Sequence, residues 1–260
     1  MPHGTRSSAS HDPITRGINL RRWRASPHCL VRFLLGAAVA VSTVAPASAQ
    51  TRAQTGGAPD SGLFAILAAQ RRVGTERFRI RQSGAGWEAA GDLQLEASGG
   101  AKVEETATLR LNSTLRPTEY ERVQKSPLSA KLQAQIGTSE TLLISTAGEE
   151  PVEQVFYLPE TSLVVLDTNF FHHFSILLRM YDQAKGGVQP FNVFIPQEAL
   201  PGTINLQYLG KENVTVGRAT KELEHYQAAT DEHEIEIWAT PEAAIHRISI
   251  PGASLEVLRQ

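Results

Sequence analysis

The segment Arg77-Phe78-Arg79-Ile80-Arg81 decides the fold, because it alternates charged and bulky apolar side chains with a period of two. Successive side chains of a β-strand point to opposite faces, so this pattern predicts a strand with one wet and one buried face. Similar short patterns occur in both halves of the chain, at 93–96, 107–111, 142–144, 204–208, 214–216, 234–238, 248–250 and 255–257. The sequence therefore predicts a mainly β protein.

Turn-forming residues separate these segments, for example Ser83-Gly84-Ala85-Gly86, Ser98-Gly99-Gly100 and Gly148-Glu149-Glu150-Pro151. Connections of this length suit hairpins and are too short for the crossover helices that parallel strands need. We predict an α+β fold, a curved antiparallel meander or half-barrel with one main helix near 168–185. Residues 62–69 are apolar enough for a short helix or an entering strand, and periodicity does not decide between them.

The segment 168–183 contains neither Gly nor Pro, and its large apolar residues recur every three or four positions. Phe170, Phe174, Leu177, Leu178 and Tyr181 would form one stripe of a helix that packs on or into the sheet between its two halves. Asp167 or Thr168 would cap its start, and Gly186-Gly187 would end it.

The first 49 residues have the three parts of a secretory signal. Arg21-Arg22-Trp23-Arg24 is cationic, the stretch from Phe33 to Val44 is apolar, and Ala47 and Ala49 are small residues of the kind that a signal peptidase accepts. The apolar part is shorter than the ~20 residues of a spanning helix. We expect a cleaved signal peptide (1–49), a flexible segment (50–61) and a single β-rich domain (62–260), without a transmembrane anchor after cleavage.

The expected location is the periplasm or the exterior of a bacterium, because the Ala-rich core of the leader and its Ala47-Ser48-Ala49-Gln50 end are typical of bacterial signal peptides. The single cysteine, Cys29, lies inside the leader, so the exported product would contain no disulfide. Removal of the leader leaves 19 Lys and Arg against 26 Asp and Glu, a net charge of −7. This acidic balance argues against nucleic acid as a partner.

Two pairs of histidines suggest chemistry without defining it. His172 and His173 are neighbours on the predicted helix and point about 100° apart, so we expect one to be partly buried and the other to be wet. His225 and His233, with Asp231 and Glu232, flank a predicted hairpin turn near 229–232, where a zinc site is an open but disfavoured alternative. We therefore predict no metal site, no cofactor and no catalytic residue.

Aromatic and branched residues concentrate around the predicted helix. A curved sheet wrapped on such a helix either fills its concave face or leaves a cavity there, and the filled interior is favoured. If a hydrophobic ligand binds, we expect it to contact Phe170, Phe171, His173, Phe174 and Tyr181.

The order of features resembles that of uncharacterised exported β-rich bacterial proteins, and more weakly that of the LolA- and LppX-like half-barrel carriers of the cell envelope. The segments that carry the resemblance are Gly74-Thr75-Glu76-Arg77-Phe78, the stretch from Asp167 to His173, Pro196-Gln197, and the closing segments 234–238 and 248–250. The resemblance covers about Val73 to Arg259. It implies a curved antiparallel sheet that encloses a helix and, in some carriers, lipid.

Two functions remain open. The favoured one is an exported soluble module that binds a lipid, a hydrophobic small molecule or an envelope protein without catalysis. The alternative is a periplasmic hydrolase in which His172 or His173 works with Asp167 or Asp182 as base and orienting group.

The leader supplies a first testable prediction. When the full chain is expressed in a bacterium with a periplasm, intact mass spectrometry of the exported protein should give a chain that starts near Gln50. A mature protein that begins at Met1 would contradict the cleavage.

Overall fold

The computed structural model describes residues 57–96, 100–148, 150–216 and 219–260. The predicted signal peptide and residues 50–56 of the predicted flexible segment lie outside the described residues. Asp60 and Ser61, which we assigned to that flexible segment, belong to the first strand instead. Residues 62–69, for which the sequence left both a helix and a strand open, belong to this strand as far as Ala68.

In the described residues, the fold is one curved sheet of 15 strands with a single α-helix, which confirms the predicted mainly β class. The strands of the first half are β1 (Asp60–Ala68), β2 (Arg71–Ser83), β3 (Gly86–Glu96), β4 (Lys102–Leu111), β5 (Pro117–Ser126), β6 (Ala130–Ile136), β7 (Thr141–Thr146), β8 (Val152–Phe156) and β9 (Leu163–Val165). Those of the second half are β10 (Val188–Ile195), β11 (Leu200–Val216), β12 (Ala219–Ala229), β13 (Glu234–Ala239), β14 (Ile245–Ile250) and β15 (Leu255–Arg259).

The strand order is that of two meanders joined in the middle. The sheet runs from β8 back to β1, then from β15 back to β9, so that β1 and β15 pair at the junction. Every neighbouring pair is antiparallel except β9 and β10, which are parallel because helix α1 (His173–Met180) crosses between them. The predicted segments 204–208 and 214–216 are two parts of the long strand β11, with an irregular register between Tyr208 and Gly210.

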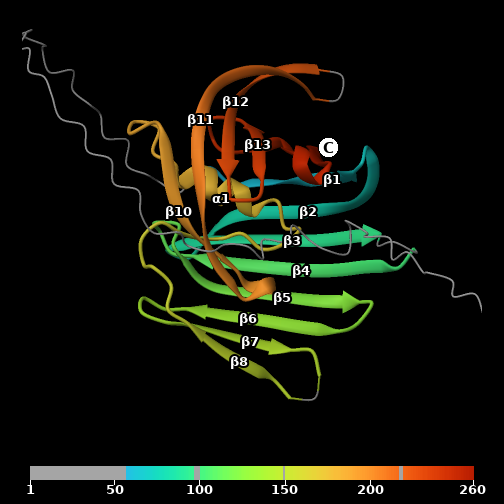
Figure 1. Ribbon diagram of the computed structural model, residues 1–260, viewed down its shortest axis with the longest axis vertical. Helices are drawn as coiled ribbons and strands as arrows, with labels where there is room; N and C mark the ends of the chain where they lie inside the picture. The colour runs from blue at the N-terminus through green and yellow to red at the C-terminus, as the bar shows by residue number, and fades with distance from the viewer. Residues whose placement is uncertain (1–56, 97–99, 149, 217–218) are drawn as a thin grey trace, which may run out of the picture.

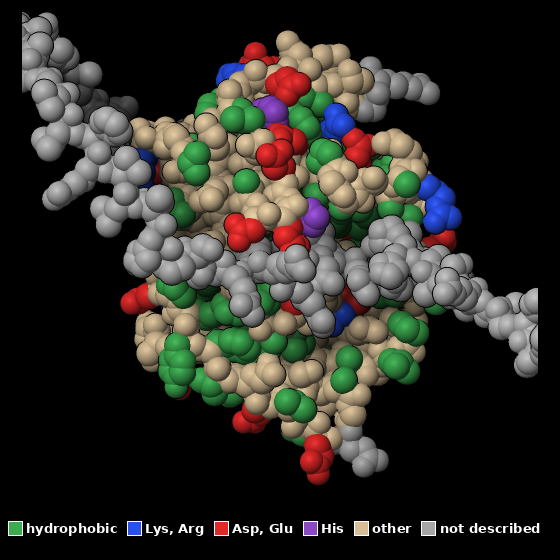
Figure 2. All heavy atoms as spheres, in the orientation of Figure 1, with side chains coloured by type: hydrophobic (Ala, Val, Ile, Leu, Met, Phe, Trp, Pro, Cys, Tyr) green, Lys and Arg blue, Asp and Glu red, His purple; other side chains and the backbone are tan. Residues whose placement is uncertain are grey.

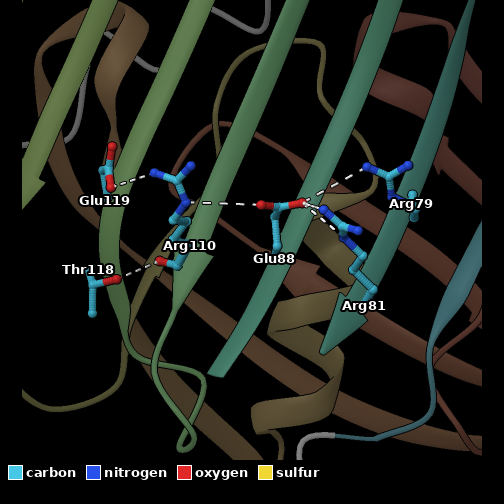
Figure 3. Close-up of polar contacts among 6 residues, drawn as sticks. All are labelled: Arg79, Arg81, Glu88, Arg110, Thr118 and Glu119. Atoms are coloured by element: carbon cyan, nitrogen blue, oxygen red, sulfur yellow. Dashed lines mark hydrogen bonds and ion pairs between the residues drawn. The ribbon is translucent and has the colours of Figure 1, made fainter. Parts of the chain in front are cut away.

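The alternation in β2 to β5 places most charged side chains outside and large apolar ones inside, with Glu76, Glu105 and Arg122 as exceptions on the inner face. On the outer face, Arg81 Nη2 lies 2.7 Å from Glu88 Oε1, Arg110 Nη1 lies 2.7 Å from Glu119 Oε2, and Thr118 donates to the Arg110 carbonyl (Figure 3). Exposed ion pairs of this kind contribute at most about 1 kcal/mol each. These pairs therefore add little stability, and they keep the outer face of the sheet solvated. Phe78 and Ile80 face the core.

The sheet curls around its own helix. Figure 1 shows β2 to β8 running across the view and β10 to β13 running at a steep angle to them, with α1 in the region where the two groups meet. β9 contacts both α1 and β5, which joins the two halves at the centre. We call residues 166–181 the plug, because contacts from this segment reach β2, β5 and β12.

The helix is shorter than predicted and is buried on every side. It spans His173–Met180 rather than 168–185, and His173 to Leu178 are buried without interruption. Asn169 has a φ of 68°, a left-handed conformation that breaks the predicted first turn. The five residues of the predicted stripe are buried, and burial extends beyond them to His173, Ser175 and Ile176, because the sheet encloses the helix.

Glu76 on β2 replaces the caps that we predicted at Asp167 and Thr168. Its Oε2 accepts from the Phe171 amide at 2.9 Å, and its Oε1 accepts from the His172 amide at 3.5 Å and contacts His172 Nδ1. These amides lie at the start of the helix, where backbone donors have no helical partner. A carboxylate from a distant strand therefore fixes the position at which the helix begins.

Gly91 on β3 makes room for this arrangement. A Cβ atom at residue 91 would lie 2.8 Å from His172 Cε1 and 3.1 Å from Glu76 Oε1. Neither group can move aside, because both side chains are fully buried.

We predict that Gly91→Ala lowers the free energy of unfolding by about 1–3 kcal/mol, the usual cost of overpacking a core. Gly148→Ala is the matched control, because a Cβ atom there meets nothing within 4 Å. Urea denaturation of both variants tests the prediction, and equal stabilities would refute the close packing of His172 on β3.

Candidate functional site

A small cavity lies beside the plug and is the candidate binding site. It has a volume of about 40 Å³ and is lined by residues of the plug, β10, β11, the turn after β12, and β13: Leu166, Asp167, Thr168, Asn169, Phe170, Phe171, Phe174, Val193, Ile204, Thr230 and Ile235. Pockets for whole small-molecule ligands measure roughly 300–1,000 Å³. This cavity is large enough for a short alkyl group and too small for an acyl chain.

The lining divides into an apolar floor and a polar rim. The floor contains fully buried side chains such as Phe170, Val193 and Ile204. Thr168, Asn169 and Thr230 are only partly buried, so the cavity approaches the surface on their side. The arrangement suits a group with an apolar end and a polar continuation.

Asp167 connects the cavity wall to both halves of the sheet. Its Oδ2 accepts from the Tyr120 hydroxyl on β5. Its Oδ1 accepts at 2.9 Å from the backbone amide of Gln197, which lies just after β10. The Asp167 amide donates to His173 Nδ1 at 3.2 Å. One aspartate thus ties the start of the plug to β5, to the β10–β11 connection and to α1.

Burial dominates the electrostatics of this cluster. Desolvation raises the pKa of Asp167 to about 6, although its hydrogen bonds from Tyr120 and Gln197 oppose the shift. Desolvation and the nearby Asp167 carboxylate raise the pKa of the Tyr120 hydroxyl, so it remains a donor. Desolvation, assisted by the neighbouring His172, lowers the pKa of His173 well below its ordinary value, so its ring stays neutral.

A buried ion pair supports the Asp167 cluster from β4 and β5. Arg122 Nε donates to Glu105 Oε2 at 2.9 Å, and Arg122 Nη2 contacts both Glu105 Oε1 and Gln124 Oε1. The side-chain amide of Gln197 faces the same guanidinium, and its oxygen accepts from Arg122 Nη2 at 2.6 Å. The two side chains of the ion pair are 11% and 6% exposed, so solvent screens the pair little.

The structure brings together three of the five residues that we predicted for ligand contact. Phe170, Phe171 and Phe174 line the cavity. His173 lies behind it, with its Nδ1 occupied by the Asp167 amide. Tyr181 lies at the far end of α1, where its hydroxyl donates to the Gly187 carbonyl at 2.7 Å and its ring packs edge-on against Tyr226.

The imidazoles of His172 and His173 do not have the surroundings that the hydrolase hypothesis requires. Both side chains are 0% exposed, whereas we expected one to be wet. Both rings are sealed inside the sheet, and their centroids lie 4.4 Å apart. His172 contacts Glu76 rather than Asp167 or Asp182, and Asp182 instead accepts from the amides of Ala184 and Lys185.

The second histidine cluster also separates in the structure. His225 Nε2 lies 2.7 Å from Glu236 Oε2, and its Nδ1 lies 3.2 Å from Glu212 Oε2. His233 lies in the predicted turn, where its amide donates to Thr230 Oγ1. Among the described residues, no group of three or more His, Cys, Asp or Glu side chains is arranged to hold a metal ion.

Sequence analysis missed the residues that position the plug. Glu76, Tyr120, Glu105 and Arg122 are absent from the predicted site, yet all four lie inside the sheet. A signal for Glu76 was present, because it has the same parity as Phe78 and Ile80 and so must share their buried face.

Comparison with known proteins supports the fold and leaves the activity open. No protein-family model matches the chain, and no curated protein matches it. The chain is similar in structure to a β-barrel-like protein of the domain of unknown function DUF1849 from Brucella abortus, with a TM-score of 0.54 and 8% identity over 78% of this chain and 94% of that one. It also matches a DUF1089 family protein from Pseudomonas aeruginosa with a TM-score of 0.44 and 12% identity, over 68% of this chain and 90% of the other.

Within the described ranges, the structure contains no helix with the length and apolar character needed to cross a bilayer.

The shifted pKa of Asp167 gives a prediction with a definite sign. Between about pH 4 and 6 the native protein holds a proton that the unfolded chain has lost, so this group makes the protein less stable as pH rises through that window. In Asp167→Asn, the oxygen of the new side chain can still accept from the backbone amide of Gln197. The nitrogen of the new side chain can donate to the Tyr120 hydroxyl.

From pH 4 to 7, the free energy of unfolding of Asp167→Asn should therefore rise relative to the wild type by as much as about 3 kcal/mol. Urea denaturation at several pH values measures this difference. His173 stays in both proteins, so its opposite contribution, lost as pH falls below about 6.5, largely cancels. Two pH profiles that run parallel would show that Asp167 titrates normally.

Proposed function

We propose that the protein is an exported, non-catalytic binding module that takes a short apolar group of its ligand into the cavity beside the plug. The predicted leader supports export, and the β-barrel-like fold is compatible with a binding module. The observation that carries the proposal is the cavity itself, with a floor of Phe170, Phe171 and Phe174 and a rim of partly exposed polar residues.

The volume of the cavity defines the size of the ligand group. A space of about 40 Å³ is well below the ~150 Å³ of an engineered apolar cavity that holds benzene. Apolar side chains of the plug and the sheet pack into one buried cluster, so a lipid enclosed among them would need this core to open. We therefore favour a ligand whose alkyl tip alone is buried over the transport of a whole acyl chain.

The polar rim supports an amphiphilic ligand. Thr168, Asn169 and Thr230 offer hydroxyl and amide groups where the cavity approaches the surface. The Asp167 carboxyl already has two hydrogen-bond donors, which leaves less capacity for a ligand. The neutral groups of the rim would orient the ligand, and burial of its apolar group on the floor would supply most of the affinity.

Sealed imidazoles favour binding over hydrolysis. A general base must lie within hydrogen-bonding reach of the proton that it removes. The Nε2 atoms of His172 and His173 are buried without a hydrogen-bond partner among the described residues, and both side chains are inaccessible to solvent.

The test uses a graded series of linear alcohols from methanol to hexanol and methyl NMR of the exported protein. Short alcohols should shift the methyl signals of Ile204 and Ile235, and the affinity should stop rising once the chain exceeds the cavity. Val193→Ile should weaken binding of the best alcohol by at least fivefold, because an added methylene fills the space.

Val214→Ile is the matched control, because Val214 is buried in a separate small cluster with Leu223 and Trp238. It should leave the alcohol affinity unchanged. Absence of shifts at Ile204 and Ile235, or equal effects of the two variants, would contradict the proposed site.

A further inference from the structure

The two end strands of the sheet differ in their surroundings. β9 is buried at all three of its residues, whereas β8 is exposed at Val152, Glu153, Gln154 and Val155 and half-buried only at Phe156. β8 pairs with β7 along one edge, and no described strand pairs with its other edge. Figure 1 shows β8 as the last strand at the lower end of the sheet.

The free edge of β8 lacks most of the features that prevent strand pairing. Natural edge strands are protected by lysines, internal prolines, bulges or covering segments. β8 contains no Lys and no Pro, and its register with β7 is regular from Thr141–Phe156 to Ser145–Val152. Among the described residues, its protection consists of its shortness, the charge of Glu153 and the flanking Pro151, so its second edge is available to a further strand.

Exposed apolar side chains surround this edge on both faces of the sheet. Val152, Val155 and Tyr157 are 60%, 53% and 80% exposed. Val152 pairs with Ser145 and Val155 with Leu142, so the two valines lie on opposite faces. Figure 2 shows hydrophobic side chains over the lower part of one face and acidic side chains at its lower margin.

The stretch of sequence that contains β8 carries charge of one sign. Between Leu132 and Leu178 the sequence contains no Lys or Arg, and its acidic residues are Glu140, Glu149, Glu150, Glu153, Glu160 and Asp167. Glu150 and Glu153 are exposed beside the free edge. A second copy paired through β8 would bring like charges together, whereas a basic strand would complement them.

We propose that β8 is a docking edge to which a partner protein adds an extended segment with alternating basic and apolar residues. Backbone hydrogen bonds along β8 would supply affinity, as in other cases of β-strand addition. Basic side chains on one face of the added strand would lie beside Glu153, and apolar ones on the other face beside Val152 and Phe156. This surface is separate from the cavity, so the proposal does not depend on the proposed ligand site.

The probes are two acetylated, amidated peptides, Lys-Val-Lys-Val-Lys-Val and Glu-Val-Glu-Val-Glu-Val, titrated into the exported protein. The basic peptide should bind at least tenfold more tightly than the acidic one. Amide hydrogen exchange should show new protection at alternate residues of β8, and the affinity should fall with added salt.

The double variant Glu150→Lys/Glu153→Lys should reverse the preference between the two peptides. Glu232→Lys/Glu242→Lys adds the same charge at exposed turns on the other half of the sheet and should preserve the preference for the basic peptide. Circular dichroism checks that both variants are folded.

Three outcomes would overturn the proposal. They are the absence of binding by the basic peptide, an affinity that Glu150→Lys/Glu153→Lys leaves unchanged, and protection of β8 that depends on protein concentration without peptide. The last result would assign the edge to a second copy of this chain.

Discussion

The structure depends on the buried side chain of Glu76 and on its contacts with the plug. A charged group inside a protein is costly unless hydrogen bonds satisfy its oxygens. Glu76 is 0% exposed, and its oxygens meet the amides of Phe171 and His172 and the His172 ring. This requirement fixes the plug against β2, and removal of one member of such a set typically costs about 3–5 kcal/mol.

Asp167 performs the same task on the other side of the plug. Its hydrogen bonds with Tyr120 and Gln197 hold the beginning of the plug to β5 and to the β10–β11 connection. Two carboxylates therefore locate a helix of only eight residues, which is too short to be stable alone. Because the plug is held in place, its side chains fill much of the interior of the curled sheet, and the small cavity lies beside Asp167. The filled interior is the reason to favour recognition of a short apolar group over carriage of a lipid.

Much of the fold could be predicted from the sequence, since alternation with a period of two identifies strands that have one wet face. The pattern at Arg77–Arg81 lies in the middle of β2, and the predicted hairpin turn near 229–232 lies between β12 and β13. Leu163–Val165 gave no such signal, because a parallel strand buried on both faces has no alternation to detect. β12 was predicted only as the strand that precedes this turn, because Lys221, Glu222, Glu224 and His225 interrupt the alternation.

The candidate site was harder to predict because it depends on pairs of residues far apart in the sequence. The aromatic floor of the cavity could be predicted from the concentration of Phe170, Phe171 and Phe174. The partners of the plug could not be identified by local spacing, because Glu76 and His172 are 96 positions apart. Parity within a strand was the usable signal: Glu76 precedes Phe78 by two, and Glu105 precedes Ala107 by two, so each carboxylate must face the core.

Native-state hydrogen exchange in low concentrations of denaturant tests most directly whether the plug and the sheet form one cooperative unit. If Glu76 holds the plug as described, the Phe171 and Ser175 amides should exchange only through global unfolding, with the same denaturant dependence as Phe78 and Ile80 in β2. Exchange of Phe171 and Ser175 through a local opening, while the β2 amides remain protected, would show that the sheet stands without the plug.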